Sequence, residues 1–299
     1  MKIILYFFIA TVVLAGCARL DDNLFNPNEN GISEYKLDAY TGEVDFRLPD
    51  VYDIPANKVH LFTLDSKAED EGTPTKIWAV YIGDKARIAT DTVILYCHGN
   101  KDHLDFYWPR AQLLANTGGK NRYGVLMIDY RGYGLSEGEP SEEGLYADVD
   151  AGVQWLKAQG LTGDRLMVYG FSMGSAPAVK LTAQPLSLRP SRLMLEAPFA
   201  SAAVMVQDAT ALALPARFVT DLKINNAEWI KSVSQPLFWT HGDKDDFLNA
   251  NTHGRLVYDN HKVSYKESHV VRGAGHSNVP LLMGFDNYRA AVLSFITRR

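Results

Sequence analysis

The chain has 299 residues, of which 46% are hydrophobic and 22% are charged, and its formal net charge is −5 at pH 7. This balance is typical of a globular protein with a sizeable core, and the length allows one or two domains. Nothing in the sequence forms a basic stripe, so nucleic acid is not expected as a partner.

The first sixteen residues have the pattern of an export signal. Lys2 precedes an almost purely apolar run over residues 3–14, which is too short to span a bilayer comfortably. The run ends at Leu14-Ala15-Gly16-Cys17, and small residues before a cysteine resemble the signal of bacterial lipoproteins. A short signal anchor or an ordinary secretory signal is the alternative interpretation.

The resemblance implies a signal peptide over residues 1–16 and fatty acyl chains such as palmitate on Cys17. Two or more acyl chains on one residue anchor a protein stably to a membrane. Ala18, rather than aspartate, follows the cysteine, and by the same resemblance this favours the outer membrane of the bacterial envelope, facing the periplasm. Lipidation of Cys17 would leave Cys97 without a disulfide partner, so we expect Cys97 to be a buried small side chain.

Residues 17–57 are polar, with Asn, Asp, Pro and Gly between single apolar residues. We interpret them as a tether and N-terminal extension of a domain that spans residues 58–299. In that domain short apolar runs alternate with amphipathic stretches, which indicates a mostly parallel, eight-stranded sheet with helices on both faces. The expected strands are 59–64, 76–82, 92–97, 123–128, 165–170, 192–196, 236–240 and 264–271. The expected helices are 108–117, 141–159, one from the turn at residues 170–174 (here called the elbow) to about 183, and 281–297.

The sequence Gly170-Phe171-Ser172-Met173-Gly174 lies between an apolar run and a stretch of small residues compatible with a helix. Gly-x-Ser-x-Gly at a strand-to-helix turn is typical of a serine whose hydroxyl is exposed as a nucleophile. A side chain at either glycine would collide with the neighbouring strand or the incoming helix. The backbone N–H of Met173 would point toward negative charge that develops on a substrate carbonyl.

A serine nucleophile needs a base, and the base needs an acid that orients it. His276 is the expected base, because Gly273-Ala274-Gly275 gives it a flexible loop after the last strand. Asp243, Asp245 and Asp246 are all candidates for the acid. We expect His98 and His241, each followed by glycine after a strand, to hydrogen-bond backbone and shape loops.

Six stretches together resemble the α/β-hydrolase superfamily, and within it the small-capped serine hydrolases related to Bem46 and the ABHD13 and ABHD17 proteins. They are residues 98–100, 129–136, 170–174, 196–199, 241–245 and 273–276, and the resemblance extends over about 58–299. It implies the α/β-hydrolase fold with the catalytic order Ser172, Asp245, His276. It also implies that the N–H of Asn100, or alternatively of Lys101, joins Met173 in the oxyanion hole.

The predicted function is a serine hydrolase of the carboxylesterase, lipase or thioesterase type. It would cleave a carboxylic ester or thioester through an acyl-enzyme intermediate, without a cofactor. The expected partners are a small-molecule ester or lipid and a membrane reached through the anchor; the sequence leaves the oligomeric state open. A serine peptidase or amidase of the same fold and a catalytically silent binding lipoprotein are the alternatives.

Two further interpretations concern a metal and a cap. His98, Asp102 and His103 could suggest a metal site together with residues 243–246, but asparagine at position 100 breaks the metallo-hydrolase pattern, so no metal is expected. Residues 200–235 are predicted to form a short cap. Its apolar side chains could line an acyl pocket or face the core; they are Val204, Met205, Leu212, Leu214 and Phe218.

Overall fold

The structure is a computed structural model that describes residues 24–27, 31–69, 72–119, 122–209 and 220–298. The predicted signal peptide, Cys17 and residues 210–219 of the predicted cap lie outside these residues. Within the described ranges, no helix has the length and apolar character needed to cross a membrane.

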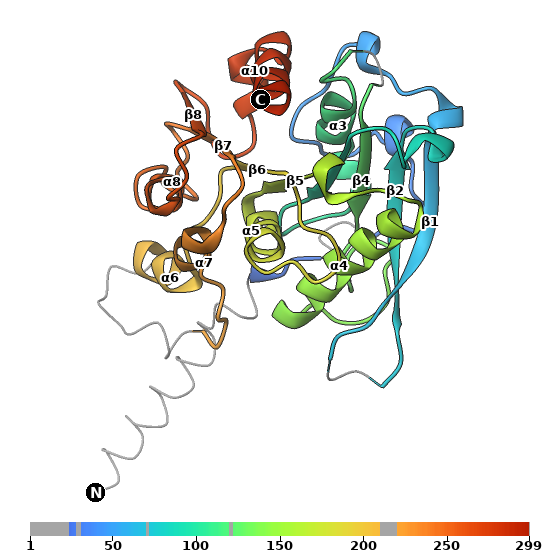
Figure 1. The fold of residues 1–299 in the computed structure, drawn as a ribbon, viewed down its shortest axis with the longest axis horizontal. Helices are drawn as coiled ribbons and strands as arrows, with labels where there is room; N and C mark the ends of the chain where they lie inside the picture. The colour runs from blue at the N-terminus through green and yellow to red at the C-terminus, as the bar shows by residue number, and fades with distance from the viewer. Residues whose placement is uncertain (1–23, 28–30, 70–71, 120–121, 210–219, 299) are drawn as a thin grey trace, which may run out of the picture.

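In the described part of the chain, eight strands form one sheet in the order β1-β2-β4-β3-β5-β6-β7-β8 (Figure 1). Strand β2 pairs antiparallel with β1 and β4, and all other neighbours are parallel. The predicted mostly parallel, eight-stranded sheet is confirmed. The strands are β1 (Val59–Ser66), β2 (Thr75–Ile82), β3 (Val93–Cys97), β4 (Gly124–Ile128), β5 (Leu166–Phe171), β6 (Arg192–Glu196), β7 (Leu237–Gly242) and β8 (Lys266–Val271).

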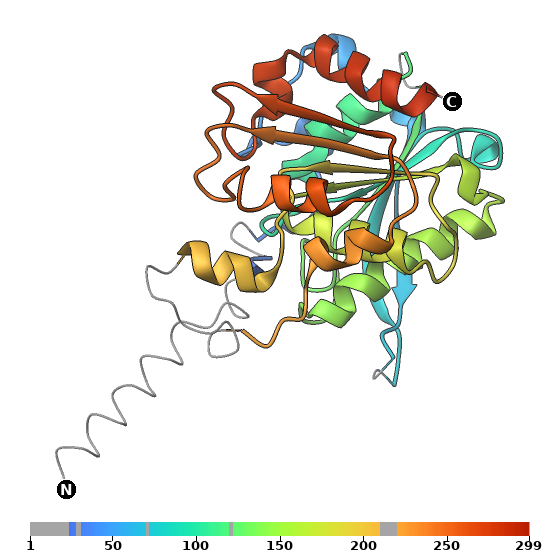
Figure 2. The ribbon, with the colours of Figure 1, turned by 60° about the vertical axis from the view of Figure 1, so that its left-hand side comes forward.

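Helices cover both faces of this sheet. Helices α3 (Leu104–Ala115) and α10 (Phe285–Thr297) pack on one face, and α4 (Glu142–Ala158), α5 (Ser175–Ala183) and α8 (Gly254–Asn260) pack on the other. Figure 2 shows α10 and α8 on opposite sides of β7 and β8. Alternate residues of β3 enter the two cores: Leu95 and Cys97 face α4 and α5, and Ile94 and Tyr96 face α3.

The helix ends agree with the sequence in part. Ser141 caps α4 by accepting a hydrogen bond from Gly144 N–H at 3.0 Å, as its position before two glutamates indicates. Helix α3 begins at Leu104, four residues before the predicted start, and Pro109 lies inside it. The predicted helix 281–297 is two helices, α9 (Val279–Met283) and α10, because Gly284 has a φ of 84° that interrupts helical geometry.

Two described helices lie in the predicted cap, α6 (Ala202–Ala209) and α7 (Asn226–Trp229). Ala227 and Ile230 belong to the core on the face of α4 and α5, and Val204 and Met205 are partly buried against that core. Leu212, Leu214 and Phe218 lie outside the described residues. The described ends of this segment are therefore attached to the domain by apolar contacts.

The described residues of 24–58 are here called the N-terminal segment. Most of the segment packs on the same face as α3 (Figure 1), whereas Leu24 and Phe25 pack in the core on the other face. Three of its side chains are buried in the core of the α3 face and are each no more than about 5% exposed: Phe46, Tyr52 and Ile54. Asp105 at the start of α3 accepts hydrogen bonds from backbone N–H groups of the segment. In its described part, the extension is a packed layer of the domain rather than a spacer.

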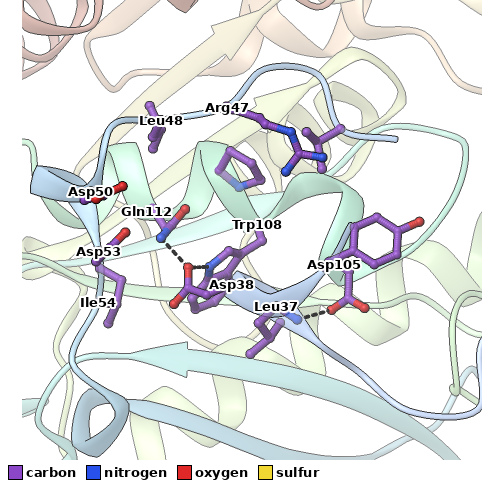
Figure 3. Close-up of a pocket in the computed structure, with 13 residues that line it drawn as sticks. Leu37, Asp38, Arg47, Leu48, Asp50, Asp53, Ile54, Asp105, Trp108 and Gln112 are labelled. Carbon is purple, nitrogen blue, oxygen red and sulfur yellow. Dashed lines mark hydrogen bonds between the residues drawn. The ribbon is translucent and has the colours of Figure 1, made fainter. Parts of the chain in front are cut away.

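A pocket of about 420 Å³ lies between the N-terminal segment and α3 (Figure 3). Asp38 from the segment points at α3, where Trp108 Nε1 and Gln112 Nε2 both donate hydrogen bonds to its carboxylate. Burial raises the pKa of Asp38, and the Trp108 hydrogen bond opposes this. These contacts hold the segment along the length of α3.

The packing of the segment can be tested at Phe46. The Phe46 ring lies 5.5 Å from that of Phe285 and is 5% exposed, so Phe46→Ala should lower the free energy of unfolding by about 3–5 kcal/mol. Urea unfolding followed by circular dichroism measures this. Val51 lies five residues later and is 66% exposed, so Val51→Ala should change the free energy of unfolding by less than about 0.5 kcal/mol. Equal values for the two variants would contradict the packed arrangement.

Candidate active site

Ser172 lies at a sharp turn between β5 and α5. Its φ is 52°, a left-handed conformation that non-glycine residues rarely adopt. A Cβ atom at Gly174 would lie 2.1 Å from the Cys97 carbonyl oxygen, and one at Gly170 would lie 2.7 Å from Ala178 Cβ. The predicted reason for both glycines is confirmed. Strand β3 and helix α5 approach the turn so closely that a side chain at position 170 or 174 would clash with them.

The structure brings Ser172, His276 and Asp245 together in one hydrogen-bonded line. His276 Nε2 lies 2.8 Å from Ser172 Oγ, and His276 Nδ1 lies 2.8 Å from Asp245 Oδ2. A carboxylate only accepts, so Nδ1 carries the ring proton and Nε2 is left to accept from the serine hydroxyl. In this arrangement Ser172 Oγ can lose its proton to His276 as it attacks a carbonyl.

Asp245 is oriented by four hydrogen bonds. Its Oδ1 accepts from the N–H groups of Phe247 and Leu248 at 3.0 and 2.8 Å, and its Oδ2 lies 3.0 Å from His241 Nε2 as well as near His276. Burial works to raise the pKa of the Asp245 carboxyl, but the hydrogen bonds from His241 and His276 hold it well below its usual value. The group is therefore a carboxylate at neutral pH.

The other two carboxylates of the predicted acid cluster do not face His276. Asp243 is exposed and accepts a hydrogen bond from the N–H of Gly273 at 2.6 Å. Asp246 is also exposed. Of the three alternatives, the structure therefore brings only Asp245 to the imidazole, and Asp243 shapes the loop that leads to it.

The loop after β3 places Asn100 beside Ser172 in the same cavity. His98 Nδ1 lies 2.9 Å from the Gly99 carbonyl, and in a trans peptide the N–H of Asn100 points the opposite way. The Asn100 carbonyl accepts from the Tyr133 hydroxyl at 3.1 Å. These contacts orient both peptides around Asn100, and His98 holds backbone as the sequence indicates.

The two remaining oxyanion candidates differ in their surroundings. Met173 directly follows Ser172 in the first turn before α5. Lys101 also lines the cavity, as Asn100 does. Asn100 and Lys101 are therefore both candidates for the partner of Met173, as the sequence indicates.

The cavity at Ser172 has a volume of about 260 Å³ and is rich in aromatic rings. The His276 ring lies 5.4 Å from that of Phe171 and 5.1 Å from that of Phe247, which is 54% exposed at the rim. Neither Val204 nor Met205 lines the cavity. Its described lining residues are Asn26, Asp45, Gly99, Asn100, Lys101, Phe106, Tyr107, Phe171, Ser172, Phe247, His276 and Ser277.

The residues of the alternative metal site do not converge. His98 faces Asp129, with Nε2 and Oδ1 3.2 Å apart, and His103 faces Asp105 at 3.8 Å. Neither points toward residues 243–246. Among the residues that the structure describes, no three His, Cys, Asp or Glu side chains are grouped so that they could hold a metal ion.

The chain is similar to several known proteins. Residues 89–235 match the family described as serine aminopeptidase, S33. A protein of Mycobacterium tuberculosis described as uncharacterized is 36% identical over 192 residues, 64% of this chain, and the chain spans 65% of that protein. Alpha/beta hydrolase domain-containing protein 17B of Xenopus tropicalis is 27% identical over 212 residues, 69% of this chain and 66% of that protein. The predicted resemblance to ABHD17 proteins is confirmed.

Solved structures decide the fold. The esterase Pf2001 of Pyrococcus furiosus superimposes with a TM-score of 0.66 at 19% identity, covering 92% of this chain and 98% of that one. An alpha-beta hydrolase from Vibrio vulnificus has a TM-score of 0.60 at 21% identity, covering 80% and 81%. The chain has the α/β-hydrolase fold. Together with the family match, the fold supports a hydrolase.

The sequence missed the direct role of His241 in this α/β-hydrolase site. Trp239 Nε1 donates to His241 Nδ1 at 3.3 Å, so the ring proton lies on Nε2, which faces Asp245 Oδ2 and the Leu248 carbonyl. The spacing of four residues between His241 and Asp245 is the signal that could have identified this role.

The elbow makes a stability prediction. A methyl group at position 174 would clash with the Cys97 carbonyl, so Gly174→Ala should lower the free energy of unfolding by about 1–3 kcal/mol or more. Gly72→Ala is the matched control, since nothing lies within 4 Å of a Cβ there. Thermal unfolding compares the two, and an unchanged melting temperature for Gly174→Ala would contradict the close contact.

The lowered pKa of Asp245 makes a pH prediction. Asp245 contributes stability above the usual carboxyl pKa of about 4, and the contribution is lost as the pH falls toward the lower pKa of the folded state. Asp245→Asn cannot titrate. Below about pH 4, the free energy of unfolding should therefore fall more steeply in the wild type, by up to about 1.4 kcal/mol per pH unit. Denaturant titrations at several pH values measure both slopes, and equal slopes would rule this contribution out.

Proposed function

We propose that the chain is a serine hydrolase that cleaves a carboxylic ester or thioester through an acyl-enzyme intermediate. Ser172 attacks the carbonyl while His276 takes its proton and later returns a proton to the leaving group. Asp245 orients and stabilises the imidazolium, and the N–H groups of Met173 and Asn100 bind the oxyanion. Water then attacks the acyl-enzyme, with His276 as base again.

The observation that carries this proposal is the unbroken line of hydrogen bonds from Ser172 through His276 to Asp245, at 2.8 Å in each step. A catalytically silent binding protein would have no need of a correctly protonated base in contact with a strained serine. Residues held in rarely populated backbone conformations concentrate at functional sites. The φ of Ser172 therefore supports an active nucleophile.

The cavity favours an uncharged ester over the substrate of an aminopeptidase. An aminopeptidase must bind a protonated α-amine, which calls for a free carboxylate near the scissile bond. Asp45 is the carboxylate in the described lining, and Arg110 already pairs with it. Lys101 adds positive charge to the same lining. The volume of about 260 Å³ is slightly below the roughly 300–1,000 Å³ of most ligand sites and favours a short acyl group.

Replacement of the nucleophile tests the proposal. Ser172→Ala removes the attacking oxygen and should lower kcat for p-nitrophenyl acetate by at least about 1,000-fold. It should also abolish covalent labelling by a fluorophosphonate probe. Ser175→Ala is the control, since Ser175 is buried three residues later and bonds Asn226 at 3.1 Å. Full activity of Ser172→Ala would show that another group is the nucleophile.

A panel of substrates separates the related activities. The proposal expects p-nitrophenyl esters with two to four acyl carbons to be hydrolysed faster than long-chain esters and than aminoacyl amides. Preference for an aminoacyl amide would favour the peptidase alternative. A wild-type protein that stays unlabelled by the fluorophosphonate would favour the silent binding lipoprotein.

We also propose that Cys17 is lipidated and anchors the protein in the bacterial envelope, at the outer membrane facing the periplasm. The support is the sequence Leu14-Ala15-Gly16-Cys17 after an apolar run. Metabolic labelling with a palmitate analogue should mark the wild type and not Cys17→Ser. Recovery of both proteins from the membrane fraction in equal amount would contradict the anchor.

A further inference from the structure

A buried ion pair, separate from the hydrogen-bonded line of Ser172, His276 and Asp245, connects the N-terminal segment to the loop of His276. Asp45 lines the cavity at Ser172, yet its side chain is only 3% exposed and accepts a hydrogen bond from Arg110 Nη1. Arg110 belongs to α3 and is 1% exposed. The proposed acyl-transfer chemistry uses neither side chain.

Both members of this pair contact Ser277, the residue that follows His276. Arg110 Nη2 donates to the Ser277 carbonyl at 2.8 Å and to Glu196 Oε1 at 2.9 Å. The side chain of Ser277 lines the same cavity as Asp45 and opposes the burial-driven rise in the pKa of Asp45. The backbone of the His276 loop is thus held at the Ser277 carbonyl by a guanidinium that is itself paired with Asp45.

The same guanidinium also touches the elbow. Its central carbon lies 4.1 Å from the centre of the Phe171 ring, which is next to Ser172 in sequence and 5.4 Å from the His276 ring. Arg110 therefore contacts the loop that carries the base and the strand end that carries the nucleophile. A shift of Arg110 would change the separation of these two elements.

The N-terminal segment holds the opposite wall of the site as well. Asn26 N–H donates to the Asn100 carbonyl at 2.9 Å, and the Tyr35 hydroxyl donates to Asp129 Oδ2 at 2.6 Å. Asp129 in turn faces His98, which orients the Gly99 peptide. The loop that carries Asn100 is therefore bonded to this segment directly, and the His276 loop is linked to it through Arg110.

Stability alone is a weak explanation for the cluster. It buries two carboxylates, Asp45 and Glu196, around one guanidinium. Burial raises the pKa of Asp45 against the opposing effect of Arg110, which shows that desolvation is costly there. Well-packed apolar residues often stabilise a core as much as a buried ion pair does. What apolar residues cannot do is donate a hydrogen bond to the Ser277 carbonyl.

We propose that the Asp45–Arg110 pair is a positioning device that keeps His276 within hydrogen-bond distance of Ser172, so that the N-terminal segment completes the active site. This inference rests on the proposed serine hydrolase function. Asp45 and Arg110 act through Ser277 and do not touch the reacting atoms. Displacement of a catalytic group by about 1 Å can cost about 100-fold in rate, so a small movement of this loop is sufficient.

The first test replaces Asp45 by an uncharged residue of the same shape. Asp45→Asn should lower kcat for p-nitrophenyl acetate by about 10- to 100-fold and leave KM within about twofold, because the base moves while the aromatic cavity stays. The control is Asp148→Asn, which breaks the Arg131–Asp148 pair. That pair is equally buried, at 4% and 0% side-chain exposure, and does not line the cavity. The control protein should have a lower melting temperature than the wild type. Its kcat should be unchanged when it is assayed well below that melting temperature.

A second variant acts at a half-buried position and avoids a charge change. Ser277→Ala removes the hydroxyl that lowers the pKa of Asp45 and keeps the carbonyl to which Arg110 donates. It should lower kcat by about 3- to 10-fold with little change in melting temperature. In the double variant Asp45→Asn, Ser277→Ala, the loss should be no larger than in Asp45→Asn alone, because both changes remove the same contact.

Two outcomes would overturn the positioning role. One is an Asp45→Asn protein with wild-type kcat and a lowered melting temperature, which is the behaviour expected of the Asp148→Asn control. The other is an Asp45→Asn protein that does not fold while Ser277→Ala keeps wild-type kcat. Failure of the proposed function looks different, because the wild type itself would neither hydrolyse the ester nor react with a fluorophosphonate, and both proposals would then fall.

Discussion

The contact between the elbow and the end of β3 determines how the site is built. Gly174 lies so close to the Cys97 carbonyl that no side chain fits between them. This approach brings Ser172 next to the loop that begins at His98, and it fixes the two relative to each other through backbone atoms. Backbone packed against backbone is stiffer than a contact between flexible side chains, so the backbone around Ser172 has little freedom to move.

Around this rigid centre, the remaining groups are held by hydrogen bonds to charged side chains. Asp245 accepts from two histidines and two backbone N–H groups, and Arg110 donates to two carboxylates and one carbonyl. Each charged group is buried and each is satisfied on several sides, which is the condition under which buried charge is tolerated. The site therefore has a stiff backbone core and an outer layer whose geometry depends on ionisation.

The sequence predicted the sheet, the elbow and the residues brought to Ser172, because each depends on a local pattern. Apolar runs identify strands, and glycines two residues either side of a serine identify the turn. Choosing Asp245 over Asp243 required the family pattern, since three carboxylates within four residues look alike until the chain is folded. Asp45 and Arg110 could not be found in this way. They are 65 residues apart in the sequence and come into contact only in the folded chain. The polar composition around Asp45 is equally typical of a spacer.

The separation of these residues along the chain has a kinetic consequence. Arg110 and Ser277 are 167 positions apart, and His276 and Ser172 are 104 apart. Contacts of such long range form late in folding, because loop closure must precede them. A chain still being synthesised therefore contains Ser172 long before it contains His276. In the proposed mechanism, activation of Ser172 requires that the final strand and its loop have already joined the sheet.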